Sequence, residues 1–357
     1  MRKNLGKIFV GLVAVIVLAV IFMRGNQLEN LIKTIEKGTP IFLILAVALQ
    51  MGKYFSQGAS FIWCFKAVDS KIGFWEGVKL VFSTFFVDTV VPSFNMSGTS
   101  VVIKDASRDD IPAGQATGAA LLRQVSINAG FLVIMVIGFV ILAIAGGLKP
   151  GWLALGIVAV LIVGVMVGAM AFAAAKPALL LKWTAPLVRL ADKVAAKLKK
   201  GSVDSWVKQT VDTYSSSAKM MVGNRKDIIA EFAFSVLASM FEMGCFAFTG
   251  MAFGVHSIEA LVCGYVVVTL FAMLSIIPQG VGVVEAAALV TFSLFGIEQA
   301  TGMATVMVYR AIVFWLPFLV GAIVIQRSKL LKDDDKGNGD SAKKPHEKAR
   351  KTTGGGK

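Results

Sequence analysis

The chain has few of the side chains that support metal or nucleophile chemistry. Its two histidines, His256 and His346, leave almost no material for a multi-histidine zinc site or a histidine-based catalytic triad. Cys64, Cys245 and Cys263 lie in or beside apolar runs, at no spacing typical of a disulfide framework or a thiolate metal site, so we interpret them as small core residues. No G-x-x-x-x-G-K-[ST] sequence precedes a helix, which argues against transport driven by the chain's own nucleotide hydrolysis. We therefore expect no cofactor and no metal.

Charged residues are also scarce within the long apolar runs. Hydrophobic residues make up 56% of the 357 residues and the mean hydropathy is +0.74, values typical of a polytopic helical membrane protein. The net charge of +14 would suggest nucleic acid in a soluble protein, but here the lysines and arginines lie in the loops and the tail. Cytoplasmic loops beside anionic lipid explain that placement better. We expect membrane lipids as partners and no nucleic acid, and we leave a homo-oligomer open.

The pattern of apolar runs predicts an all-α integral membrane protein. The predicted spans are 8–23, 40–65, 116–145, 152–175, 228–253 and 301–326. Basic residues flank the first and last of these runs, so both termini are predicted in the cytoplasm of a multi-pass cell-membrane protein. We divide the chain into a transmembrane domain, 1–327, and a disordered basic cytoplasmic tail, 328–357. The domain includes a basic amphipathic cytoplasmic insertion at 176–228.

Helix breakers interrupt two of the apolar segments. Pro278, Gly280 and Gly282 open the helix in I277-P-Q-G-V-G-V-V-E, between apolar pieces at 257–277 and 281–297. The apolar segment 77–92 is shorter than a full span and ends in the polar run P92-S-F-N-M-S-G-T. In hydrocarbon, such backbone is tolerated only where it is buried in protein or lines a water-filled cavity. We expect re-entrant or broken helices entering from opposite sides, a possible inverted repeat around a polar cavity at mid-depth.

Six charged residues lie inside apolar runs, where a charge costs about 2.5–3.5 kcal/mol near the bilayer centre. They are Lys53, Asp88, Arg123, Glu242, Glu285 and Arg310. Glu285 falls in the first turn after the break, where the positive end of the helix dipole stabilises a carboxylate. Arg310 lies too deep in the last span to reach the outer surface easily. We therefore predict a Glu285–Arg310 ion pair.

Two interpretations of these charges remain open. In one, the Glu285–Arg310 pair is only a structural staple. In the other, Arg310 and Arg123 contact phosphate oxygens of a charged headgroup, and Glu242 and Asp88 contact its cationic or hydroxyl-rich part. Backbone donors of the opened helix assist the second arrangement. The candidate substrate-binding residues are Asp88, Arg123, Glu242, Pro278, Gly280, Gly282, Glu285 and Arg310. Lys53 is left out, because its long stem can reach an interface.

Several motifs carry a family resemblance. The specific ones are Glu242 within its span, I277-P-Q-G-V-G-V-V-E-A-A, and V308-Y-R-A-I-V-F-W-L-P, with weaker matches at F86-V-D-T-V-V-P-S, Gly98 and A120-L-L-R-Q-V. Together they resemble the transmembrane domain of the lysylphosphatidylglycerol synthase/flippase family. Gln279 departs from the family's usual glycine, and Leu122 and Asn128 stand where the family often has carboxylates. We expect no soluble aminoacyltransferase domain, so lysyl-lipid synthesis is not carried over.

The resemblance implies a helical bundle that moves a lipid, or a lipid with a sugar or amino-acid headgroup, between leaflets. We therefore expect a flippase or scramblase-like transporter and not an enzyme, since Glu242 has no recognisable nucleophile or metal beside it. The alternatives are an ion-coupled small-solute transporter and a non-transporting scaffold. A cavity open sideways to acyl chains favours a lipid, and a small closed hydrated site favours a solute. Full mutual pairing of the charges without a cavity favours a scaffold.

Overall fold

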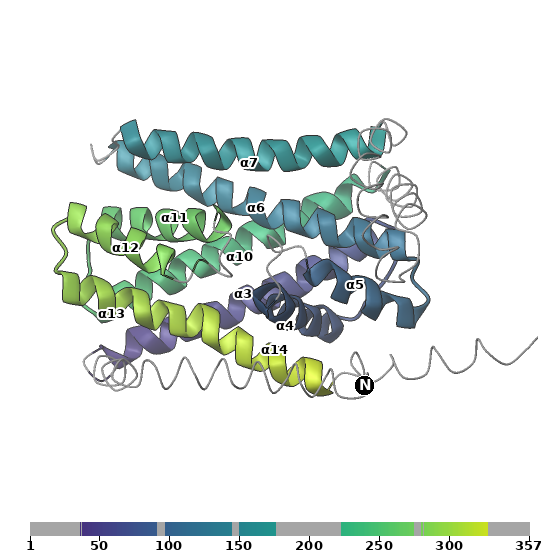
Figure 1. Ribbon diagram of the computed structural model, residues 1–357, viewed down its shortest axis with the longest axis horizontal. Coiled ribbons are helices and arrows are strands. Elements are labelled where there is room, and N and C mark those ends of the chain that lie inside the picture. Colours follow the sequence, from purple (N-terminus) through teal and green to yellow (C-terminus); the bar gives the residue numbers. More distant parts are fainter. Residues whose placement is uncertain are drawn as a thin grey trace, which may run out of the picture.

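The computed structural model describes residues 36, 38–90, 97–144, 150–175, 223–274, 280 and 282–327. In that part of the chain, four helical runs are long and apolar enough to cross a membrane. They are α3 (Pro40–Lys66), α6 (Ala113–Ile144), α10 (Arg225–Ala252), and the continuous run of α13 (Gln299–Arg310), η4 (Ala311–Trp315) and α14 (Leu316–Arg327). The described residues form no β-strand, and the long helices lie along the long axis of the molecule (Figure 1). This confirms the predicted all-α polytopic membrane fold.

The predicted spans agree with the helices that the structure describes. The described residues of the apolar runs at 40–65, 116–145 and 301–326 are helical, the run at 228–253 is helical up to Ala252, and the run at 152–175 forms α7 (Pro150–Ala175). The predicted first span at 8–23, the tail at 328–357 and nearly all of the insertion at 176–228 lie outside the described residues, as do Pro92 and Pro278.

Helices α3 and α10 form an antiparallel pair in the middle of the bundle. Pro40 opens α3 at a position where its missing N–H costs no hydrogen bond. The Thr39 N–H donates to the Ala252 carbonyl at 2.9 Å, which ties the start of α3 to the end of α10. Further along, the Ser56 hydroxyl donates to the Phe234 carbonyl at 2.7 Å. These contacts hold the two helices in a defined register.

Two helical hairpins enter the bundle from opposite ends (Figure 1). Helices α4 (Phe74–Val90) and α5 (Gly98–Ala106) run in and back from the end where α3 finishes and α6 begins. Helices α11 (Ile258–Leu274) and α12 (Val283–Leu294) do the same from the other end. The nine residues of α5 and the twelve of α12 span only about 14 Å and 18 Å, well short of a ~30 Å hydrocarbon core.

A local widening of the helix interrupts the last span. Pro317 has no N–H, and its ring would clash with the carbonyl four residues earlier in a regular α-helix. Residues Ala311–Trp315 are π-helical, and the Leu316 N–H bonds to the Ala311 carbonyl. The wider turn relieves the clash and lets the span continue to Arg327. Arg310 stands directly before this segment.

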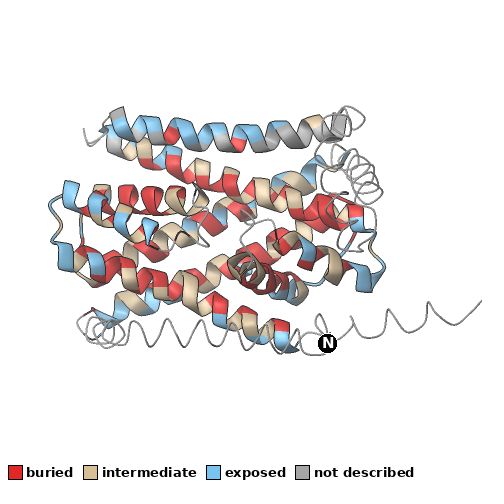
Figure 2. Cartoon of the chain, viewed as in Figure 1, coloured by how far each residue is buried: buried red, intermediate tan, exposed pale blue. Residues whose placement is uncertain are grey.

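The buried apolar residues form two main clusters, one beside each hairpin. The first gathers around Phe246, which makes an edge contact with Tyr309 at 4.9 Å between ring centroids and stacks on Phe292 at 6.1 Å. The second includes Phe61 and Phe65 of α3, with residues of α4, α5 and α6. Figure 2 shows the buried residues on the inner faces of the helices, and α7 mostly exposed.

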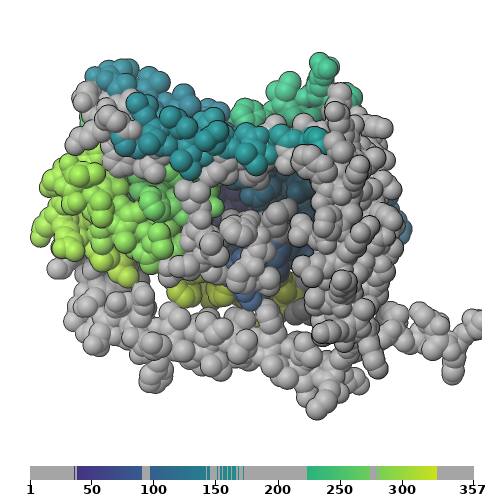
Figure 3. Space-filling view, turned by 45° about the horizontal axis from the view of Figure 1, so that its top comes forward, coloured from purple at the N-terminus to yellow at the C-terminus, as the bar shows by residue number. Residues whose placement is uncertain are grey.

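Helix α7 lies at the margin of the described bundle. Gly156 allows close packing on α6, since a Cβ there would lie 2.3 Å from the Phe139 ring. Figure 3 shows α6 and α7 in teal across the upper part of the molecule, with the yellow-green C-terminal helices at the left. Ile157, Leu161 and Val165 of α7 are exposed, as expected for side chains that face acyl chains.

Candidate functional site

A polar cavity of about 200 Å³ lies between the two apolar clusters. Its walls include Tyr54 and Val81 from the cluster beside α4 and α5, and Phe131 from the cluster beside α11 and α12. Its polar lining comes from α3, α4, α6, α10 and α11 and comprises Lys53, Gln57, Thr84, Asp88, Arg123, Gln124, Asn128, Ser239, Glu242 and Thr269. Lys53 is the middle residue of α3, so the cavity lies about halfway along that span.

One wall of the cavity carries an ion pair between the two central helices. Lys53 Nζ of α3 bonds to Glu242 Oε1 of α10, and the two side chains are 15% and 19% exposed. The Tyr265 hydroxyl of α11 lies 3.4 Å from Glu242 Oε2 and donates to it. The interpretation of Lys53 as a residue that reaches an interface was wrong, because its ammonium group faces this cavity.

Asp88 connects the cavity to the α4–α5 hairpin. Its Oδ1 accepts hydrogen bonds from the Ser97 hydroxyl at 2.9 Å and from the Gly98 N–H at 2.7 Å. The positive end of the α5 dipole therefore meets a carboxylate. Gly98 has to be small, since a Cβ there would lie 2.6 Å from Asp88 Oδ2. Asp88 thus holds the start of α5 and also lines the cavity.

Arg123 of α6 is the cavity cation without a carboxylate partner. Its guanidinium carbon lies 4.2 Å from the centroid of the Phe61 ring, a cation–π contact. Its Nε is buried and has no hydrogen-bond partner, and no ion pair joins Arg123 to any carboxylate in the part of the chain that the structure describes. The Lys53 charge is neutralised by Glu242 in an ion pair, whereas Arg123 lines the cavity without an ion pair to a described carboxylate.

The predicted Glu285–Arg310 ion pair is confirmed, and it lies outside the cavity lining. Arg310 Nε donates to Glu285 Oε1 at 2.9 Å, and Glu285 Oε2 accepts from the Gly282 N–H at 2.6 Å. Gly282 (φ +92°) and Gly280 (φ +63°) adopt left-handed backbone, which glycine permits without strain. None of these four residues lines the cavity, although Val313, one turn beyond Arg310, does.

The structure therefore divides the predicted site. Asp88, Arg123 and Glu242 meet in the cavity, whereas Gly280, Gly282, Glu285 and Arg310 form a separate group at the start of α12. Pro278 lies outside the described residues. The sequence reading missed the uncharged polar lining, chiefly Gln57, Gln124, Asn128, Ser239 and Thr269. Their signal was present, since amides and hydroxyls inside apolar runs also need partners or a cavity.

These helices and the charged cavity inside them define a polytopic, all-helical integral membrane protein. The family model described as "Lysylphosphatidylglycerol synthase TM region" matches residues 8–321, so the chain belongs to that family. The chain is 22% identical over 316 residues to the UPF0104 membrane protein MJ1595 of Methanocaldococcus jannaschii, covering 87% of this chain and 91% of that protein. It is also 37% identical over 60 residues to the UPF0104 membrane protein PH1989 of Pyrococcus horikoshii, which is 17% of this chain and 18% of that protein.

Proposed function

We propose that this protein moves a phospholipid, or a lipid with a sugar or amino-acid headgroup, between membrane leaflets through the polar cavity. The observation that carries the proposal is Arg123, a cation at the cavity wall without a carboxylate partner. A guanidinium binds phosphate oxygens with two parallel hydrogen bonds, and such bonds are strong where water is excluded. The headgroup phosphate is therefore the anion that we assign to Arg123.

The rest of the lining suits a polar headgroup. Gln57, Gln124 and Asn128 bring amides to the cavity, and Ser239 and Thr269 bring hydroxyls. These groups can exchange hydrogen bonds with hydroxyl or amino groups of a headgroup. A volume of about 200 Å³ lies below the roughly 300–1,000 Å³ of typical ligand pockets, which favours one small headgroup with its acyl chains outside the cavity.

The two opposed hairpins support a transport role. We infer that α4–α5 and α11–α12 are re-entrant elements that enter the membrane from opposite faces, in the manner of an inverted repeat. Broken helices of this kind place their ends near the bilayer midplane, where a transporter binds its substrate. Rocking one hairpin against the α3–α10 pair would open the cavity to one leaflet and then to the other.

The other functions fit the geometry less well. A scaffold with fully paired charges would have no cavity, whereas this chain has a cavity with an available cation. An embedded enzyme would need a free base, but Glu242 Oε1 is engaged by Lys53. The small volume of the cavity does favour one rival, an ion-coupled transporter of a small anionic solute such as glycerol phosphate.

The test is reconstitution into vesicles that carry fluorescent lipids with different headgroups, with dithionite reporting which leaflet each lipid occupies. We expect the wild type to transfer at least one phosphate-bearing lipid faster than protein-free vesicles. Arg123→Gln should abolish transfer, Arg123→Lys should keep part of it, and Arg327→Gln, at an exposed helix end, should leave it unchanged. Full transfer by folded Arg123→Gln would contradict the proposal. Uptake of radiolabelled glycerol phosphate without lipid transfer would select the solute transporter.

A further inference from the structure

Glu231 is a fully buried acid that the proposed transport path does not use. It is the seventh residue of α10, its side chain is 0% exposed, and it does not line the cavity. Oε1 accepts hydrogen bonds from the Ser60 hydroxyl of α3 and the Ser235 hydroxyl of α10, each at 2.9 Å. Oε2 is buried and has no hydrogen-bond partner within the described ranges. A buried carboxylate placed like this is costly unless a cation stands near it.

That cation is Arg123, which also serves the cavity. Arg123 lies over the ring of Phe61 and Glu231 accepts a hydrogen bond from Ser60, so the guanidinium and the carboxyl group lie against consecutive residues of α3, where their charges interact. Phe61, on which the guanidinium stacks, follows Ser60 directly in α3. Buried Arg123 Nε and buried Glu231 Oε2 both lack hydrogen-bond partners within the described ranges. The guanidinium of Arg123 therefore lines the cavity and also lies near the buried carboxyl group of Glu231.

Two other titratable groups, Cys64 and Asp88, lie near Arg123 and Glu231. From α3 the neighbour is Cys64, a buried thiol that is neutral when protonated. From α4, Asp88 interacts with Arg123, but it is already held by Ser97 and Gly98. Close packing fixes the spacing of α6 and α10 here, since a Cβ on Gly130 would lie 2.8 Å from the Ser235 carbonyl oxygen. Asp88 also lines the cavity, whereas Glu231 is fully buried and its Oε2 has no hydrogen-bond partner among the described residues, so Glu231 is the acid whose ionised form most needs a nearby cation.

We propose that Glu231 takes up one proton when Arg123 binds an anionic headgroup, so that the protein couples lipid binding to protonation. With the cavity empty, the Arg123 charge stabilises ionised Glu231. An anion on Arg123 neutralises that charge and places negative charge nearer to the acid, so Glu231 then binds a proton from water and becomes a neutral carboxylic acid. Because such coupling is reciprocal, protonation of Glu231 must strengthen anion binding to the same extent.

This inference rests on the proposed binding of an anionic headgroup at Arg123, and it makes a prediction with a definite sign. Binding should tighten as the pH falls through the titration range of Glu231. Coupling between two sites is typically about 5- to 150-fold, which corresponds to a displacement of the Glu231 titration midpoint of roughly 0.7 to 2 pH units. Glu231→Gln, which mimics the neutral acid, should bind the anion as tightly as the wild type at low pH, without the pH dependence.

The experiment follows Glu231 itself by infrared spectroscopy of the purified full chain in a nonionic detergent. The carboxylic C=O band that disappears in Glu231→Gln belongs to this residue, and its growth with falling pH gives the titration midpoint. We expect the midpoint to rise in Arg123→Gln and to stay near the wild-type value in Arg123→Lys, which keeps the charge. Short-chain phosphatidylglycerol should raise the wild-type midpoint, and short-chain phosphatidylcholine, which has no net charge, should raise it less. Glu298→Gln, at an exposed position, is the matched control.

The outcomes separate this inference from the proposed function. An unchanged midpoint in folded Arg123→Gln overturns the coupling, as does a Glu231 band that never titrates. Lipid transfer in vesicles without any midpoint shift on adding phosphatidylglycerol also overturns the inference, while the proposed function stands. A midpoint shift without any lipid transfer supports proton-coupled anion binding and overturns the transport proposal.

Discussion

Glu285 uses both carboxylate oxygens for the fold, one for Arg310 and the other for the Gly282 N–H. Arg310 is 8% exposed as a whole residue, so its charge could not remain there without a partner. This geometry favours the staple interpretation of the pair, since the carboxylate that closes the first turn of α12 also neutralises the charge of Arg310 in the last span. Arg123 differs, because it lines the cavity and has no ion pair with a carboxylate among the described residues.

A double-mutant cycle tests the staple. We expect Glu285→Gln and Arg310→Met each to lower stability, because each removes the ion pair from a buried arginine or a partly buried glutamate. The double variant should lose less than the sum, with a coupling free energy of about 1–3 kcal/mol. Denaturant titration in mild detergent measures this, and Arg327→Met, at an exposed position, should change stability by less than about 0.5 kcal/mol. Strict additivity of the two losses would show that the pair does not stabilise the fold.

At the scale of elements, the α4–α5 hairpin is held against α3 by a crossing that only glycine permits. A Cβ on Gly77 of α4 would lie 2.4 Å from the Gly58 carbonyl oxygen of α3, and a Cβ on Gly58 would lie 2.5 Å from a methyl group of Val78. Backbone atoms cannot move aside as a side chain can, so the two helices must separate if either glycine gains a side chain. Small residues at such crossings are how membrane helices achieve close packing.

Substitution at that crossing should therefore destabilise the protein. We expect Gly77→Ala to cost about 1–3 kcal/mol through overpacking, measured as a lower melting temperature of the detergent-solubilised protein. Gly164→Ala on α7 is the matched control, since a Cβ there meets nothing within 4 Å. It should be neutral or gain up to about 1 kcal/mol from helix propensity. Equal losses for both variants would mean that the α3–α4 contact is not the cause.

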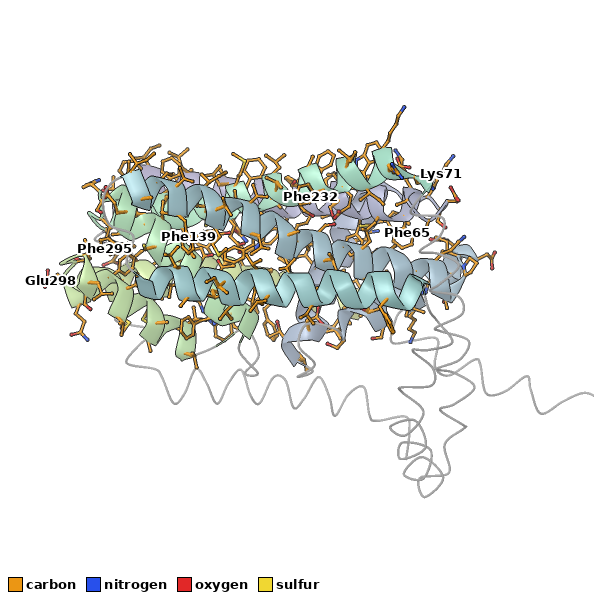
Figure 4. All side chains as sticks on the ribbon, turned by 90° about the horizontal axis from the view of Figure 1, so that it is seen from above. Phe65, Lys71, Phe139, Phe232, Phe295 and Glu298 are labelled. Atoms are coloured by element: carbon orange, nitrogen blue, oxygen red, sulfur yellow. The ribbon has the colours of Figure 1, made fainter. Side chains whose placement is uncertain are left out.

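At the scale of the whole molecule, charge differs between the two ends of the bundle. Lys71 and Glu298 lie at opposite ends in Figure 4. The helix ends on the Lys71 side carry Lys66, Arg108, Arg225, Lys226 and Arg327. The positive-inside rule predicts that this end faces the cytoplasm, in keeping with the predicted cytoplasmic position of both termini.

Cysteine labelling tests that orientation. We expect a membrane-impermeant maleimide to label Glu298→Cys in intact cells and to label Lys71→Cys only in inverted vesicles, because each residue lies at one end of the bundle (Figure 4). The native Cys64, Cys245 and Cys263 are buried, so the unsubstituted protein should give little background. Labelling of Lys71→Cys from outside would reverse the orientation and also the faces from which the two hairpins enter.

Particular residues show how far sequence reasoning reaches. The Glu285–Arg310 pair was predictable because dipole position and depth in a span follow from counting residues along one helix. The role of Lys53 was misjudged because its partner Glu242 lies 189 residues away in sequence, and no local pattern joins them. Likewise, the capping of α5 by Asp88 depends on how the chain turns between α4 and α5.

The sequence by itself determined the all-helical membrane class, most span boundaries and the broken segments, because hydropathy, proline and glycine act locally on the backbone. Only the tertiary structure decided that Asp88, Arg123 and Glu242 share a cavity while Glu285 and Arg310 stand apart from it. It also decided that Glu231 is buried and bonded to Ser60, next in sequence to the Phe61 ring that Arg123 contacts. The physical reason is that the cost of desolvation, which can be read from the sequence, requires a partner for each buried charge. The identity of that partner depends on how α3, α6 and α10 pack together.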